Sequence, residues 1–489
     1  MNFRTTNATE IALLFAALAA LGMGLLLVQI TPPLALGIGL GLVVLVIAVA
    51  SDELALYLLI FSMLLGPEFI VGELGKGTIS GRGLTFRVDD VLIVIIGFAW
   101  VAKTALHKDL GLFLQTPLNR PIVAYSSAAV FATGLGMIVG RVSLLAGTFF
   151  VLKFIQYFVI YFMVVNNLRD RRQFERFLVA ILATAAIASL IGILQIPSGL
   201  RVSAPFEGGS GEPNTFGGYL VLMLALVAGL YLTSESFERK WLFFLLAVVT
   251  VLPLLFTLSR ASYLALIPLA GGLFVYSQRK LFLAALFALS LVLAPFLLPK
   301  AVIERIFFTF SQRYHPTQTQ IAGIRLDTSA SERIRALQDV VLADWPKHPV
   351  FGYGVTGYHF VDSQYLRVLA ETGLVGLLAF LWLQISLFRR ARDVLRRTKD
   401  PLFKGVTLGF VAGFMGLIVH SIGTNTFIIV RIMEPFWFLA GMVIMIPQLE
   451  VLSPSAEPPR RAEPLRKRPF ASAPVSPGSR SASVGQPSP

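Results

Sequence analysis

Apolar residues come in blocks of about twenty along this chain, and short polar segments separate the blocks. A helix of that length crosses about 30 Å of hydrocarbon. Strict apolar–polar alternation is absent, so we expect helices that satisfy their own backbone rather than a barrel. The pattern predicts about fourteen transmembrane helices, within a range of 12–14, at residues 10–30, 33–50, 53–67, 89–106, 121–139, 146–167, 175–195, 214–233, 240–258, 261–277, 281–298, 368–388, 403–421 and 428–447.

Composition supports a membrane protein. Of 489 residues, 56% are hydrophobic and only 14% are charged, which is too few to cover a soluble protein of this length. The net charge of +14 could indicate nucleic-acid binding, but Lys and Arg gather in short segments between apolar blocks and in the last forty residues, so we expect no nucleic-acid partner. The absence of cysteine excludes disulfides and thiolate metal sites. Block 10–30 is too long for an ordinary signal peptide and is predicted to be an anchor.

The basic segments also predict an orientation. Arg and Lys cluster at 169–176, 239–240, 279–280 and 389–399. With the N-terminus inside and an even number of spans, all four segments and the basic tail face the cytoplasm, as the positive-inside rule requires. Both termini are therefore expected in the cytoplasm. The polar segments sent outward are 68–88, 196–213 and 299–367.

The long outer segment is the one soluble piece large enough to fold locally. Its stretch Glu332–Asp344 has apolar residues at helical spacing and is predicted to form an amphipathic helix on the membrane surface. A turn rich in Pro and Gly follows from Trp345 to Gly357, and Asp362–Ala370 begins a helix that continues into the twelfth span. The expected organisation is thus N-terminal membrane helices at 1–88, central membrane helices at 89–298, the outer loop at 299–367, C-terminal membrane helices at 368–448 and a disordered basic tail at 449–489.

Two arginines at the predicted outer ends of spans are candidates for binding an anion. Arg260 stands between two apolar runs with almost no polar break, where an unpartnered arginine costs about 2.5–3.5 kcal/mol on insertion scales. It either extends toward anionic lipid headgroups or binds an anion through its planar fork. Arg201 opens a glycine-rich outer loop, and the alternative for it is an ordinary solvated arginine.

Asp362 is the candidate for acid–base chemistry. It precedes the predicted helix beginning Ser363–Gln364, so it either caps that helix or acts as a general base. Arg367 and Arg431 are further arginines on the outer side with weaker cases. His420 lies within a span, where an ionisable group suggests function, although a structural role is the alternative.

Several segments, taken together and in order, resemble the O-antigen ligase and O-antigen polymerase family. They are TLSRASYLAL around Arg260, the loop RVSAPFEGGSGEPNTFGGYL, the stretch HPVFGYGVTGYHFVDSQYLRVLAETGLVGLLAFL, and VHSIGTNTFIIVRIMEPFWFLAG. The resemblance covers about residues 90–447. It implies a GT-C-like fold and a glycan donor carried on undecaprenyl pyrophosphate in the bacterial inner membrane. It also implies a glycan or lipid-linked acceptor, periplasmic chemistry, and neither a nucleotide cofactor nor a metal. Arg260 would hold the donor pyrophosphate and Arg201 would assist it.

One departure from the family pattern affects the acceptor side. Ligases of lipid A core carry a histidine, usually followed by asparagine, just before the Tyr-Leu helix start. Here these positions are Asp362 and Ser363, which favours a polymerase or another type of ligase. We therefore expect Asp362 to take the proton of an acceptor hydroxyl in an inverting transfer. A transporter or flippase of lipid-linked glycans is the main alternative, and functional charges near the bilayer midplane would support it.

Overall fold

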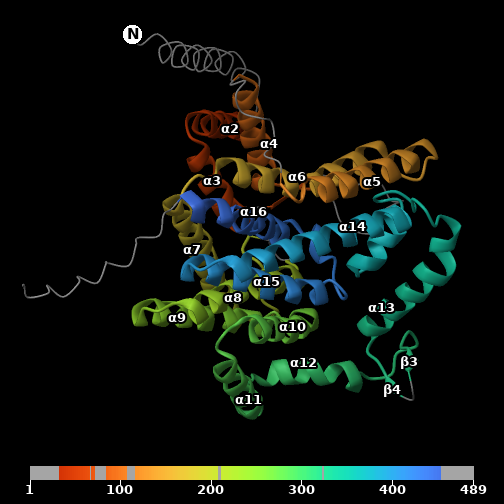
Figure 1. The fold of residues 1–489 in the computed structure, drawn as a ribbon. Coiled ribbons are helices and arrows are strands. Elements are labelled where there is room, and N and C mark those ends of the chain that lie inside the picture. Colours follow the sequence, from red (N-terminus) through yellow and green to blue (C-terminus); the bar gives the residue numbers. More distant parts are fainter. Residues whose placement is uncertain are drawn as a thin grey trace, which may run out of the picture.

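A computed structural model of the chain describes residues 32–66, 68–71, 84–106, 116–206, 211–321 and 324–452, and this part is mainly helical (Figure 1). Predicted spans two to fourteen each coincide with a helix. Span one and the basic tail after residue 452 lie outside the described residues. The matching helices are α2 Pro32–Ala50, α3 Asp52–Leu65, α4 Val88–Leu106, α5 Asn119–Ile138, α6 Leu144–Asn167, α7 Arg171–Gln195, α8 Pro213–Thr233, α9 Phe237–Phe256, α10 Arg260–Tyr276, α11 Lys280–Leu297, α14 Gln364–Arg397, α15 Pro401–His420 and α16 Val430–Leu452.

Eight helices of the described part are long and apolar enough to cross a membrane. These are α5 to α9 and α14 to α16. A ninth is added if α11 and the following helix α12 (Lys300–Ser311), which meet at 96°, form one broken span. The chain is therefore a helical membrane protein that crosses the bilayer several times.

The centre of the bundle is built by α8, α15 and α16 (Figure 1). Glycines allow α8 and α15 to approach closely: a Cβ atom on Gly229 would stand 2.4 Å from the carbonyl oxygen of Gly405. Small residues at a helix interface are the usual means by which membrane helices bring their backbones together. By contrast, α9 and α11 carry exposed apolar side chains, as lipid-facing helices do.

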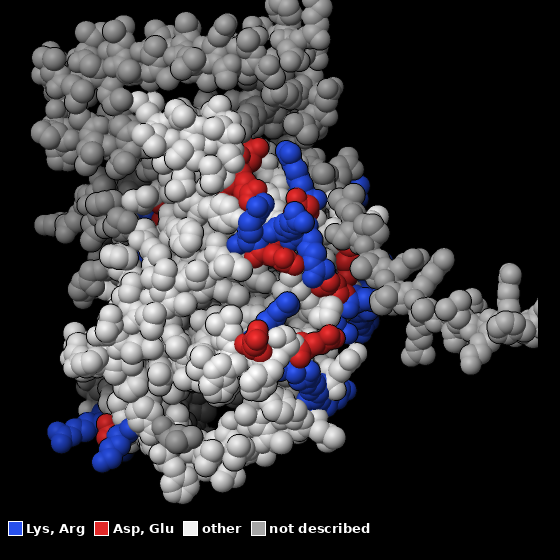
Figure 2. All heavy atoms as spheres, turned by 90° about the vertical axis from the view of Figure 1, so that its left-hand side faces the viewer, with Lys and Arg blue, Asp and Glu red and all other residues white. Residues whose placement is uncertain are grey.

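Charged side chains gather at one end of the bundle. Arg171, at the start of α7, pairs with Asp400 before α15, and Arg176 pairs with Glu53 of α3 at 2.8 Å. Glu450, near the end of α16, accepts a hydrogen bond from the backbone N–H of Asp400. Figure 2 shows Lys and Arg with interleaved Asp and Glu on the face that lies at the left of Figure 1. Segments that the sequence assigns to the cytoplasm thus meet at one end.

The segment between α11 and α14 contains more structure than the sequence indicates. Helix α12 falls within the stretch expected to be loop, and the short strands β3 (Gln320–Ile321) and β4 (Ile324–Arg325) pair antiparallel. Helix α13 runs from Thr328 to Gln338, and a π-helical turn continues it to Asp344. The expected amphipathic helix at Glu332–Asp344 therefore starts earlier and changes winding halfway. A second small hairpin, β1 (Glu68–Val71) with β2 (Leu84–Arg87), precedes α4.

Helix α14 continues from the outer segment into the twelfth span, as expected, but breaks at Gly373, whose φ is +64°. The preceding Pro- and Gly-rich turn fills the break. The N–H of Leu374 donates to the carbonyl of Pro349 at 2.9 Å, and the N–H of Tyr353 donates to the carbonyl of Ala370 at 2.9 Å. Backbone groups that the break removes from the helix are thereby satisfied, because buried polar groups need partners. This exchange fixes the first turns of α14 relative to the outer segment.

Candidate functional site

The turn between α9 and α10 presents Arg260. Leu258 in this turn has a φ of +50°, a left-handed conformation that a bulky residue other than glycine rarely adopts. Ser259 then caps α10, and its Oγ accepts a hydrogen bond from the N–H of Ser262 at 3.3 Å. Arg260 is the first residue of α10, and its side chain is 21% exposed.

The guanidinium of Arg260 is held by two elements of the outer segment. One terminal nitrogen donates to Thr309 Oγ1 of α12 at 2.7 Å, and the other pairs with Asp327 Oδ2 at 2.6 Å. Asp327 is only 2% exposed and also caps α13, accepting from the N–H of Ala330 at 3.1 Å. Arg260 is therefore an oriented, partnered group and not one that reaches freely toward lipid headgroups.

Arg201 and Arg305 converge on the same turn. Arg201 donates to the carbonyls of Thr257 at 2.9 Å and Leu258 at 3.3 Å, and Arg305 of α12 donates to that of Leu258 at 3.3 Å. Burial, together with the positive charges of Arg305 and Arg260, lowers the pKa of the Arg201 guanidinium. We call Arg201, Arg260 and Arg305 the arginine cluster. Asp327 pairs with Arg260 and the carboxylate of Glu212 acts on Arg201, so three guanidinium groups outnumber two carboxylates and the excess positive charge favours an anion.

A buried polar network holds the start of α10, which carries Arg260, in place. The hydroxyl of Ser259 donates to Asn214 Oδ1 of α8 at 2.8 Å. Ser262 lies 3.1 Å from Nε2 of His420, and Nδ1 of His420 lies 2.8 Å from Thr426 Oγ1. His420 is fully buried. The structure places it behind the cap of α10, where it links α15 to the start of the helix that carries Arg260.

Asp362 is bound by a residue further along α13. Its Oδ2 accepts a hydrogen bond from a terminal nitrogen of Arg333 at 2.9 Å, and both side chains are about one-third exposed. The N-cap of α14 is Ser363, whose side chain makes no capping hydrogen bond. Asn425 donates from Nδ2 to the carbonyl of Val361 at 2.7 Å and fixes the segment. The Asp362 carboxylate therefore faces α13 while its neighbour holds the capping position.

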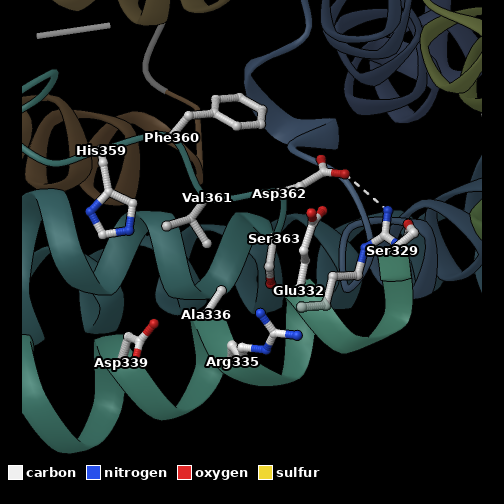
Figure 3. A pocket seen from close by; sticks show the side chains of 11 residues that line it. Ser329, Glu332, Arg335, Ala336, Asp339, His359, Phe360, Val361, Asp362 and Ser363 are labelled. Atoms are coloured by element: carbon white, nitrogen blue, oxygen red, sulfur yellow. Dashed lines mark hydrogen bonds and ion pairs between the residues drawn. The ribbon is translucent and has the colours of Figure 1, made fainter. Parts of the chain in front are cut away.

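A pocket of about 430 Å³ separates α13 from the segment 359–363. In Figure 3, Asp362 and Glu332 lie at one end of the pocket and His359 at the other. Most of its lining residues are polar or charged, and both segments contribute acids. The lining residues are Ser329, Glu332, Arg333, Arg335, Ala336, Asp339, His359, Phe360, Val361, Asp362 and Ser363.

The pocket and the arginine cluster are neighbours. A Cβ atom on Gly423 would stand 3.6 Å from both the Cβ of Ala261 and the Nε of Arg333. Gly423 is thus close both to Ala261, the residue that follows Arg260, and to Arg333, which holds Asp362. Tertiary structure therefore brings the predicted anion-binding and acid–base candidates to neighbouring positions along α13.

Two other predicted residues, Arg367 and Arg431, make structural contacts between or within helices. Arg367 pairs with Glu371 within α14 at 3.1 Å, and both side chains are largely buried. Arg431 is 1% exposed and donates to the carbonyls of Leu64 at 2.7 Å and Pro205 at 2.9 Å. Pro205 belongs to the loop that carries Arg201, so Arg431 ties this loop to α3 and α16.

Sequence reasoning missed three residues of the site and one buried charge cluster. Arg305, Asp327 and Arg333 fall in the stretch assigned to the outer loop. In the buried cluster, Arg87 pairs with Asp89 at 3.0 Å, Lys153 pairs with Asp90 at 2.6 Å, and Glu434 of α16 is fully buried. The interruption of apolar runs by Lys153 and Glu434 was an available signal, because charges within spans need partners.

A comparison with known families finds a match for part of the chain. Residues 245–381 match the family described as O-Antigen ligase. The matched range includes Arg260, Arg305, Asp327, Arg333 and Asp362, and within this range it confirms the resemblance inferred from the sequence. Arg201 and His420 lie outside it. No curated protein matches the chain.

Proposed function

Because the chain carries the region of the O-antigen ligase family, we propose that it transfers or polymerises glycan from an undecaprenyl-pyrophosphate carrier onto an acceptor sugar hydroxyl at the periplasmic face. The observation that carries the proposal is the arginine cluster next to a pocket lined by Asp362. The first feature suits a diphosphate and the second suits a hydroxyl that must lose its proton.

The donor would bind through its pyrophosphate to Arg260 and Arg201, and Arg305 adds a third guanidinium. Arginine is suited to this because its planar fork donates to phosphate oxygens in pairs. As the bond between the anomeric carbon and the pyrophosphate oxygen breaks, negative charge grows on the leaving group. Fixed positive groups stabilise that charge more than they stabilise the ground state.

The acceptor would enter the pocket beside Asp362, which takes the proton of the attacking hydroxyl. The hydroxyl oxygen bonds to the anomeric carbon on the side opposite the pyrophosphate, so the configuration inverts in one displacement. Products are the extended glycan, the lipid pyrophosphate and a proton carried first by Asp362. Asp362 and Ser363 stand where lipid A core ligases have His-Asn, so a polymerase or another ligase type is favoured.

The proposed setting is the bacterial inner membrane, with fourteen spans, a GT-C-like arrangement and cytoplasmic termini. Support comes from α15, which runs from Asp400 at the charged end to His420 beneath the arginine cluster. Its 20 residues extend for about 30 Å, the thickness of the hydrocarbon core. The site and the basic segments therefore lie at opposite ends of the bundle.

The second candidate is a flippase of lipid-linked glycans. The observation in its favour is the buried charge cluster of Arg87, Asp89, Asp90, Lys153 and Glu434, because charges inside a membrane bundle are typical of transport paths. Formation of glycan product by purified protein from a lipid-linked donor separates an enzyme from a carrier.

That assay also tests the site. Arg260→Ala should abolish product formation with normal protein levels in the membrane, and Arg260→Lys should recover only part of it, since lysine keeps the charge without the fork. Asp362→Asn keeps the size of the side chain and removes the base. Near-normal product from both Arg260→Ala and Asp362→Asn contradicts the proposal.

A further inference from the structure

We infer that Arg333 is a positioning residue for the reaction and that it acts by holding the carboxylate of Asp362. The inference rests on the proposed function, in which Asp362 takes the acceptor proton. Arg333 stands near the start of the amphipathic helix expected at Glu332–Asp344, and the structure places it in the middle of α13.

The Arg333 side chain is fixed at both ends of its guanidinium. One terminal nitrogen donates to Ser329 Oγ, one turn earlier on α13, at 2.9 Å, and the other donates to Asp362 Oδ2 at 2.9 Å. The guanidinium is planar and rigid, so anchoring one nitrogen on α13 fixes the direction of the other. Asp362 is thereby restricted in rotation about its side-chain bonds, which a general base needs in order to meet its proton.

Helix α13 is itself a firm support. The N–H of Thr328 donates to Gln312 Oε1 at 2.7 Å, and Ser331 Oγ accepts from the N–H of Thr319 at 2.8 Å. Asp327 at the start of this helix pairs with Arg260. These contacts make α13 a fixed element of the outer segment and not a solvated loop.

One helix therefore holds both candidate groups. Asp327 binds Arg260 at the N-terminus of α13, and Arg333 binds Asp362 six positions later, about 9 Å along the helix axis. The charges are complementary in both places. Helix α13 thus sets the spacing between the anion-binding arginine and the base. An ordinary surface ion pair contributes little and fixes no such spacing, so the pair of Arg333 with Asp362 differs from one.

The test measures product formation by the purified full-length protein with a lipid-linked donor and varied acceptor. Arg333→Gln should lower kcat 10- to 100-fold and leave the KM for the donor within about two-fold, because the arginine cluster is intact. Arg333→Lys should recover part of the loss. Arg325→Gln is the matched control: Arg325 is on β4, outside the pocket, with its guanidinium over the ring of Tyr314, and this variant should behave as wild type.

A double variant decides the mechanism of action. If Arg333 acts through Asp362, adding Arg333→Gln to Asp362→Asn should cause no further loss of kcat. If the kcat losses of the two single variants multiply in the double variant, Arg333 acts independently of Asp362. If the donor KM of Arg333→Gln rises strongly, Arg333 acts on the donor. Either result overturns the inference. Wild-type turnover of Arg333→Gln also overturns it, and the proposed function still stands if Asp362→Asn is inactive.

A second variant covers the case in which Arg333→Gln fails to fold. Ser329→Ala removes the anchor of the guanidinium and changes no charge. It should lower kcat two- to five-fold with an unchanged donor KM. An unchanged kcat in Ser329→Ala, with normal protein yield, contradicts the positioning role.

Discussion

Arg260, the first residue of α10, forms an ion pair at 2.6 Å with Asp327, the N-cap of α13. The two residues are 67 positions apart in the sequence, and the pair joins a membrane helix to the outer segment. A carboxylate beside a proposed pyrophosphate ligand has a clear physical role: it orients the guanidinium before substrate arrives. Orientation in advance lowers the cost of binding because less side-chain freedom is lost on binding.

Asp327 should contribute to stability in two ways, as the N-cap of α13 and as the ion-pair partner of Arg260. We expect Asp327→Ala to lower the free energy of unfolding by about 2 kcal/mol, since a lost cap costs about 1 kcal/mol and Arg260 loses its counter-ion. Asp327→Asn keeps the capping oxygen and should cost about half as much. Thermal unfolding of both variants in detergent, at one scan rate, checks this order; equal losses would show that the cap is unimportant.

Arg305 should contribute to donor affinity. A hydrogen bond to a charged group is worth about 1.5–3 kcal/mol, so Arg305→Gln should raise the KM for the lipid-linked donor by at least 10-fold. Lys300→Gln changes an exposed cation at the start of the same helix and serves as the control. Steady-state kinetics with both variants give the answer. Equal donor KM values for the two would remove Arg305 from the pyrophosphate site.

Gly373 should be irreplaceable at the break of α14. Its φ of +64° strains any other residue, and an added Cβ would lie 2.3 Å from the carbonyl oxygen of Val350. Gly373→Ala should therefore lower stability by more than 2 kcal/mol, measured as a fall in the unfolding temperature. Gly271 in α10 has open space around its Cβ position, so Gly271→Ala should be neutral or slightly stabilising. A similar fall in both variants would refute the special role of the break.

The proposed orientation can be tested directly because the chain has no cysteine. Tyr314→Cys places a single thiol at a residue that is 73% exposed in the outer segment. It should react with a membrane-impermeant maleimide in cells with an intact inner membrane. Arg397→Cys, at the basic end of α14, should react only after that membrane is permeabilised. The reverse pattern would place the arginine cluster in the cytoplasm and end the proposal of periplasmic chemistry.

The sequence predicted much of the candidate site as separate pieces. Arg260 and Arg201 stood out because charges next to apolar runs are costly, and Asp362 stood out because it precedes a helix. The sequence left open whether Asp362 caps that helix, and the structure gives the N-cap to Ser363. The sequence offered no reason to select Arg305, Asp327 or Arg333, because polar residues in a long polar segment carry no unusual free-energy cost.

Membrane helices can be predicted from a sequence because lipid imposes the same requirement on every one of them. Each needs about twenty apolar residues whose backbone groups form hydrogen bonds within the helix. The sequence by itself therefore determined helices α2 to α11 and α14 to α16 and the clustering of basic residues between them, but it did not predict α12. Only the tertiary structure decided which charges meet. The partners of Arg260 and Asp362 lie on α13, far away in the sequence, so both pairs depend on how α12 and α13 fold against the bundle.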